Sequence, residues 1–116
     1  MIPKELLKGS IKSIILKLLK ENGRMYGYEI TQKVKKITSG KVQLTYGALY
    51  PILHKLEHDG AVTTDKETVN NRTRVYYKLT DKGHNSAMEK IKELQEFVDT
   101  LSNILKPDYG LNNSLC

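Results

Sequence analysis

Hydrophobic residues recur every third or fourth position over residues 4–21, which predicts a helix with one apolar face. The same spacing predicts a shorter helix over residues 26–37. A third helix follows Thr45, whose hydroxyl can cap its first turn, and ends at Asp59-Gly60. The apolar sides of the first and third helices carry Leu7, Ile11, Ile14, Ile15, Leu18, Leu19, Leu49, Ile52, Leu53 and Leu56.

The hydrophobic period then shortens to two, which is typical of β-strands. Residues 61–66 and 74–79 are the predicted strands, and the polar residues 67–73 form the tip of the hairpin that joins them. A long helix is predicted from Thr80 or Asp81 to Leu105, where Lys106-Pro107 ends it.

The order of three helices, a hairpin and a long helix predicts the fold class. It is mainly α with a small β-hairpin (α+β), arranged as a winged helix-turn-helix followed by a long C-terminal dimerisation helix. We expect residues 1–80 to form a winged helix-turn-helix DNA-binding domain, residues 81–106 the dimerisation helix and residues 107–116 a flexible tail.

The long helix carries apolar residues separated alternately by four and three positions, which is the heptad pattern of a helix–helix seam. These are Ala87, Ile91, Leu94, Val98, Leu101 and Leu105. The pattern predicts a homodimer, and the alternative is a helix folded back on its own core. The expected dimer interface comprises Leu7, Ile11, Ile14, Ile91, Leu94, Val98, Leu101 and Leu105.

The excess of basic residues indicates a polyanionic binding partner. The chain has 19 Lys and Arg against 13 Asp and Glu, and residues 1–44 hold ten of the former and three of the latter. Such an excess favours nucleic acid or an acidic membrane surface. No apolar run approaches the roughly 20 residues that span a bilayer, and no signal peptide is recognisable, so we expect a cytoplasmic protein without membrane attachment. The one cysteine, Cys116, cannot form an intramolecular disulfide.

The third helix is the expected recognition helix. With its leucines buried, its opposite face presents Gly47, His54 and Lys55 toward DNA, while an arginine on the hairpin can reach phosphate or the minor groove. The expected DNA contacts are Lys4, Tyr26, Lys33, Thr45, Tyr46, Gly47, Tyr50, His54, Lys55, Arg72, Thr73 and Arg74.

Catalytic signatures do not appear. There is no glycine-rich phosphate loop, no Ser/His/Asp order and no Cys/His cluster, so we expect no enzyme activity and no cofactor. His54 and His58 could share a helix face, but no further ligand stands near them, and no metal is expected. Two alternatives to a sequence-specific regulator are a protein-interaction module that binds a foreign helix and a sequence-blind DNA-binding protein.

Four segments resemble the PadR family of bacterial transcription regulators in its short form. They are residues 26–30 (YGYEI), 47–53 (GALYPIL), 56–60 (LEHDG) and 76–83 (YYKLTDKG). The resemblance implies a winged-helix dimer on a pseudo-palindromic operator. It also implies repression of a nearby promoter, often its own, and release by a small-molecule inducer. Family targets include detoxification and drug-efflux genes.

Drug-sensing members of that family place a tryptophan on the C-terminal helix, facing a pore between subunits. This chain has no tryptophan, and Gln95 stands at the matching place, so the stacking residue for a flat drug is missing. The residues expected around such a ligand pore are Leu6, Gln95, Phe97 and Asp99, with Asp99 the partner for a cationic ligand.

Overall fold

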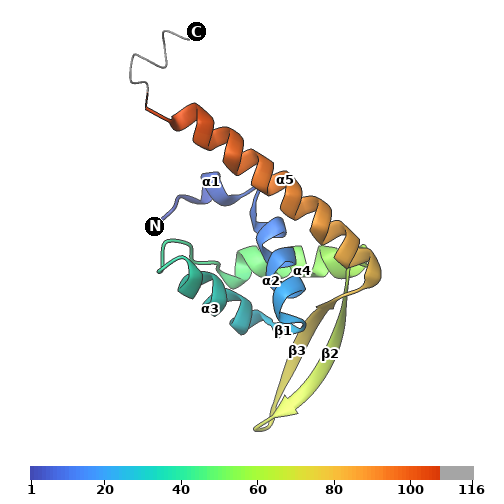
Figure 1. Ribbon diagram of the computed structural model, residues 1–116. Helices are drawn as coiled ribbons and strands as arrows, with labels where there is room; N and C mark the ends of the chain where they lie inside the picture. The colour runs from blue at the N-terminus through green and yellow to red at the C-terminus, as the bar shows by residue number, and fades with distance from the viewer. Residues whose placement is uncertain (108–116) are drawn as a thin grey trace.

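The computed structural model describes residues 1–107, in which helices pack together and a small sheet extends from one end of them (Figure 1). In chain order the elements are α1 (Lys4–Leu7), α2 (Ile11–Asn22), β1 (Met25–Tyr26), α3 (Gly27–Ile37), α4 (Tyr46–His58), β2 (Val62–Val69), β3 (Arg72–Leu79) and α5 (Asp81–Leu105). The predicted tail from residue 108 onward, with Cys116, lies outside the described residues. Within residues 1–107, no helix combines the length and apolar character needed to cross a membrane.

The core lies where α2, α3 and α4 meet the sheet. Its largest fully buried side chains come from these three helices, and each contributes roughly 1.5–3 kcal/mol by leaving water. They are Ile15, Leu16, Leu19, Ile30, Leu49, Leu53 and Leu56. The predicted apolar faces of the first and third helices are therefore buried or half-buried, whereas Ile37, predicted on the buried face of the second helix, is 61% exposed at the end of α3.

The first predicted helix is wrong in one respect, because residues 4–21 do not form a single helix. α1 ends at Leu7 and α2 begins at Ile11, with a turn at Lys8–Ser10 between them. Gly9 lies in this turn, and glycine costs a helix about 1 kcal/mol relative to alanine. The break sets α1 apart from α2 (Figure 1), while Leu7, Ile11 and Ile14 all stay half-buried against the core.

A strand of two residues, β1, was not predicted. Met25 pairs with Tyr77 and Tyr26 with Tyr76, both antiparallel, so the sheet has the order β1-β3-β2. Tyr26, predicted as the first helical residue, is instead the N-cap of α3, and its backbone N–H donates to Oε1 of Glu29 at 3.1 Å. A strand of two residues is too short to show the alternation of apolar and polar positions by which strands are predicted.

The hairpin of β2 and β3, called the wing below, has a shorter tip than predicted. Strand pairing continues to Val69 and Arg72, which leaves Asn70 and Asn71 as the connection. Their φ angles of 51° and 63° are positive, as a two-residue turn of type I′ requires, and asparagine tolerates this conformation well. The polar residues that suggested a long loop are strand residues exposed to solvent.

α5 begins as predicted, with Thr80 as its N-cap. The Thr80 hydroxyl accepts from the backbone N–H of Gly83 at 3.1 Å and donates to the carbonyl of Gly60 at 2.6 Å. Gly83 is buried so tightly that a Cβ there would overlap the carbonyl oxygen of Ala61. This contact fixes the start of α5 against the base of the wing.

We expect Gly83→Ala to lower the free energy of unfolding by about 1–3 kcal/mol, because the new methyl group must displace rigid backbone. Gly9→Ala is the matched control, since a Cβ at Gly9 meets nothing within 4 Å. Urea denaturation of both variants measures the effect. Equal stability of the two variants would contradict the described packing of α5.

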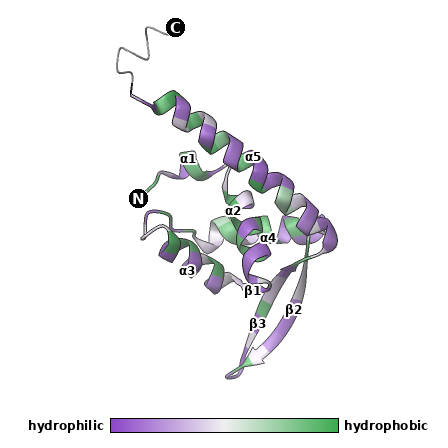
Figure 2. Cartoon of the chain, in the orientation of Figure 1, coloured by the Kyte–Doolittle hydropathy of each residue, from purple (hydrophilic) through white to green (hydrophobic). Residues whose placement is uncertain are grey.

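The first half of the α5 seam packs on the protein's own core, and the second half is exposed. Ala87 is buried against α2 and Ile91 and Leu94 are half-buried, so this half covers the protein's own core. Val98, Leu101 and Leu105 are 46%, 37% and 76% exposed. Figure 2 shows hydrophobic residues continuing to the end of α5, beyond the body of the protein.

Candidate nucleic-acid interface

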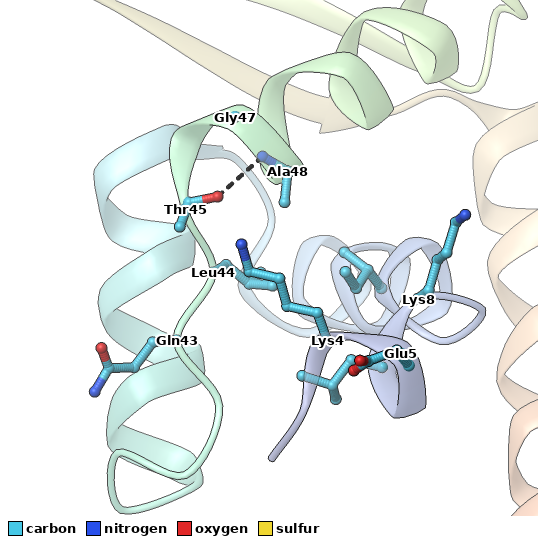
Figure 3. A pocket seen from close by; sticks show the side chains of 10 residues that line it. Lys4, Glu5, Lys8, Gln43, Leu44, Thr45, Gly47 and Ala48 are labelled. Atoms are coloured by element: carbon cyan, nitrogen blue, oxygen red, sulfur yellow. Dashed lines mark hydrogen bonds between the residues drawn. The ribbon is translucent and has the colours of Figure 1, made fainter. Parts of the chain in front are cut away.

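The N-terminus of α4 is held in place by the cap that the sequence predicts. The Thr45 hydroxyl oxygen accepts from the backbone N–H of Ala48 at 3.2 Å (Figure 3). Because Leu49, Leu53 and Leu56 are buried, the other side of the helix faces solvent. That side exposes Tyr46, Gly47, Pro51, His54, Lys55 and His58. The face predicted for the recognition helix is therefore open.

An aromatic row runs along one edge of this face. The ring centroids of Tyr46 and Tyr50 are 5.6 Å apart, and those of Tyr50 and His54 are 5.9 Å apart. Tyr50 is half-buried, which raises the pKa of its hydroxyl, and a Cβ at Gly27 would overlap that hydroxyl. Tyr50 thus joins α4 to the start of α3, while Tyr46 projects into solvent as a hydrogen-bond donor.

Lys55 lies on the exposed face one turn before the end of α4. Its Nζ is 3.4 Å from Oδ1 of Asp59, and the side chains are 69% and 37% exposed. An exposed pair of this kind contributes at most about 1 kcal/mol, so a phosphate can displace the carboxylate. Among residues 1–107, no three His, Cys, Asp or Glu side chains gather in a way that could hold a metal ion.

The predicted wing contacts are the first three residues of β3, and they divide between its two faces. Arg72 and Thr73 are exposed beside the Asn70-Asn71 turn. Arg74 lies closer to the body, and its guanidinium carbon is 4.6 Å from the centre of the Tyr26 ring. Side chains alternate along a strand, so Arg72 and Arg74 share one face while Thr73 lies on the other.

Arg24 and Tyr76 extend this arrangement, and sequence reasoning missed both. The Arg24 guanidinium carbon is 4.1 Å above the Tyr76 ring, and Arg24 also forms an ion pair with Glu67. The rings of Tyr26 and Tyr76 meet edge to face, 5.3 Å apart at 73°. Two arginines therefore lie over two tyrosines on the outer face of the sheet, an arrangement that β1 creates by pairing with β3.

The remaining predicted contacts flank α4 on two sides. Lys4 and Thr45 line a pocket of about 530 Å³ between α1 and the start of α4, together with Gly47 (Figure 3). Lys33 is exposed on α3 and shares a second groove with Tyr26. Lys4, Thr45 and Gly47 thus lie around the N-terminus of α4, and Lys55 lies in its last turn. Arg72 and Thr73 lie apart from both, beside the wing tip.

The four predicted pore residues do not come together within one protomer. Leu6 and Phe97 line a groove between α1 and α5. Gln95 instead lines a groove on another side of α5, and its Nε2 donates to Oδ1 of Asp99 at 2.9 Å. A pore containing all four would need a second copy of the chain.

The packing of α2, α3 and α4, the two-stranded wing and the open face of α4 define a winged helix-turn-helix protein, as the sequence predicts. The sequence model of the Transcriptional regulator PadR-like family matches residues 15–89. The chain belongs to this family of transcriptional regulators, which confirms the family resemblance and the fold class.

The chain is also similar to individual proteins and solved structures. An uncharacterized protein X of Lysinibacillus sphaericus is 32% identical over 97 residues, which cover 83% of this chain and 88% of that protein. A transcriptional regulator from Clostridium thermocellum is similar in structure, with a TM-score of 0.78, 26% identity and coverage of 88% and 99%. Bacillus subtilis PadR, solved in complex with operator DNA, has a TM-score of 0.61 and 28% identity, covering 75% of this chain and 47% of that one.

Proposed function

We propose that this protein is a sequence-specific regulator that binds double-stranded DNA as a homodimer. In this proposal it represses its own operon or a gene of the detoxification or efflux type until a small molecule releases it. The observation that carries the proposal is the exposed face of α4, with Tyr46, Gly47 and Lys55 in the open beside an arginine-bearing wing. The operator complex of Bacillus subtilis PadR supports the DNA-binding part.

The homodimer is proposed from the exposed end of the α5 seam. Burying apolar surface contributes about 25 cal/mol per Å², and residues 1–107 leave Val98, Leu101 and Leu105 exposed. A second copy offers the same stripe, and a two-fold dimer presents two recognition helices to two half-sites. This geometry favours a pseudo-palindromic operator.

An inducer site and a location follow from the same proposal. We place the inducer beside the α5 seam, where the groove lined by Leu6 and Phe97 adjoins the surface that a second copy would cover. Asp99 lies on another side of α5 from this groove, so Asp99 of a second copy is the proposed partner for a cationic inducer. A bacterial regulator of transcription works where the chromosome lies, so we place the protein in the cytoplasm.

A mobility-shift titration tests the proposed function. The probes are the DNA upstream of the protein's own gene and random DNA of equal length, at physiological salt. We expect the upstream DNA to bind roughly 10³-fold more tightly. Equal binding to both probes would favour the sequence-blind alternative for this DNA, and the absence of any shift would favour the protein-interaction module.

Lys55→Ala and Arg72→Ala are each expected to weaken binding to every sequence, because both side chains are exposed and placed to meet phosphate. Each variant should also show a smaller dependence of affinity on salt, by about one unit of the log–log slope. Titrations at several salt concentrations measure both quantities. Unchanged affinity in both variants would contradict the placement of α4 and the wing on DNA.

A further inference from the structure

A groove of about 440 Å³ runs along α3 beside β1 and is lined mainly by polar side chains. Three cationic residues border it, namely Arg24 before β1 and Lys33 and Lys36 on α3. Between them lie hydrogen-bonding groups of Gln32 and Tyr28, and the Tyr28 side chain is exposed. Donors therefore outnumber acceptors on its walls.

The charge of this groove is positive. Among the residues that line it, Glu29 is the one with an acidic side chain, and its Oε1 accepts the backbone N–H of Tyr26. Arg74 adds a further positive charge nearby, since its guanidinium lies over the Tyr26 ring. A ligand with a run of negative charges fits these walls better than a neutral one.

Arg24 is held in a defined position by two contacts that come from the wing. Its guanidinium lies over the Tyr76 ring and pairs with Glu67, and its side chain remains 42% exposed. Arginine has five N–H donors in one plane, so stacking leaves the edge of the group free to donate. A preplaced arginine loses less side-chain entropy when it binds an anion.

The groove also leads toward the recognition helix. A neighbouring groove of about 290 Å³ shares Tyr28 and Gln32 with it and continues to Thr45 and Tyr46 at the start of α4. Polar and cationic groups thus follow one path from the base of the wing to the N-terminus of α4. Phosphates repeat along a DNA strand in the same way, and most protein–DNA hydrogen bonds go to them.

We propose that this groove binds a stretch of DNA sugar-phosphate backbone and that Arg24 is a phosphate contact placed by Tyr76. The proposal rests on the proposed DNA-binding function and adds a site and a residue to it. Glu67 occupies an edge of Arg24 that a phosphate can take, and an exposed carboxylate pair is weak enough to be exchanged.

The test is the salt dependence of binding to a random-sequence duplex, between ~50 mM and ~200 mM salt. Each lost phosphate contact lowers the slope of log affinity against log salt concentration by about 0.9. The loss of affinity caused by Arg24→Ala should therefore be about threefold smaller at the higher salt concentration than at the lower one, for each protomer on the DNA. Lys92→Ala removes an exposed lysine from α5 and should leave the slope unchanged.

Glu67→Gln separates a phosphate contact from a role in holding the wing. It breaks the ion pair but keeps the charge of Arg24, so binding should be as tight as in the wild type or tighter. A weakening equal to that of Arg24→Ala, with the wild-type slope in both variants, would overturn the proposal in favour of a structural strap. If the wild-type protein binds no duplex at low salt, DNA binding itself is overturned. If the wild type binds and Arg24→Ala has the same log–log slope as the wild type, only the role of Arg24 is overturned.

Discussion

Val98→Asp is expected to yield a folded monomer that has lost most of its affinity for its operator. Val98 is 46% exposed and lies at the edge of a groove that α5 forms with α2 and α3, outside the fully buried core. A carboxylate there would be buried without a partner in the dimer, which is strongly unfavourable, but it stays in water in the monomer. Losing the second recognition helix should weaken specific binding by about 100-fold.

Asn103→Asp is the matched control for this variant. It adds the same charge a short distance along α5, on the side opposite the seam, and Asn103 is exposed. Sedimentation of both variants at micromolar concentration, with circular dichroism to verify folding, gives the comparison. A Val98→Asp protein that stays dimeric would show that the dimer interface lies elsewhere.

Gly47→Glu is expected to raise stability and abolish most DNA binding at the same time. A Cβ at Gly47 would meet only Thr45 Oγ1, at 3.8 Å, so the free protein has room for a side chain. Replacing glycine in a helix, with an acid in the first turn, stabilises by about 1 kcal/mol. The same carboxylate placed against DNA phosphates should weaken binding by about 100-fold on any sequence.

Gly47→Ala separates the two effects, because it keeps the gain in helix propensity without the charge. Thermal unfolding and mobility-shift titration of both variants provide the readouts. Gly47→Glu with wild-type affinity would mean that the start of α4 does not approach DNA. A loss of both stability and binding would mean that Gly47 serves the fold instead.

Long periodic segments carried most of the predictable structure. The apolar spacing in α3 and α4 and the hydroxyls of Thr45 and Thr80 placed those elements within a residue or so of their positions. These signals are local, because a helix chooses its buried face and its caps from residues a few positions apart. The exposed face of α4 could be predicted from the same spacing, because it is the side of the helix opposite the buried leucines.

The features that escaped prediction depend on contacts between distant segments or on single residues. The break at Gly9 interrupts a hydrophobic spacing that is continuous in the sequence, so the period alone could not reveal it. The Asn70-Asn71 turn was hidden because its flanking strands are polar on both faces. A better signal was available there, since two consecutive asparagines tolerate the positive φ values of a tight hairpin.

The cluster of Arg24, Tyr26, Arg74 and Tyr76 was also invisible to sequence reasoning. Alternation along residues 74–79 placed Tyr76 on the outer face, but nothing near Arg24 indicated a strand. The contact exists because β1 pairs with β3 across some fifty residues of chain. Tyr26 and Arg74 of this cluster were therefore among the predicted contacts, and Arg24 and Tyr76 were not.

Methylation protection of guanine N7 on the bound operator tests most directly whether paired α4 helices read the major groove. The N7 atom lies in that groove, so a docked recognition helix shields it. We predict two clusters of protected guanines separated by a whole number of helical turns, about 10–10.5 base pairs each, and no protection with Gly47→Glu. A single cluster would contradict the dimer, and unprotected guanines throughout a bound site would contradict major-groove reading by α4.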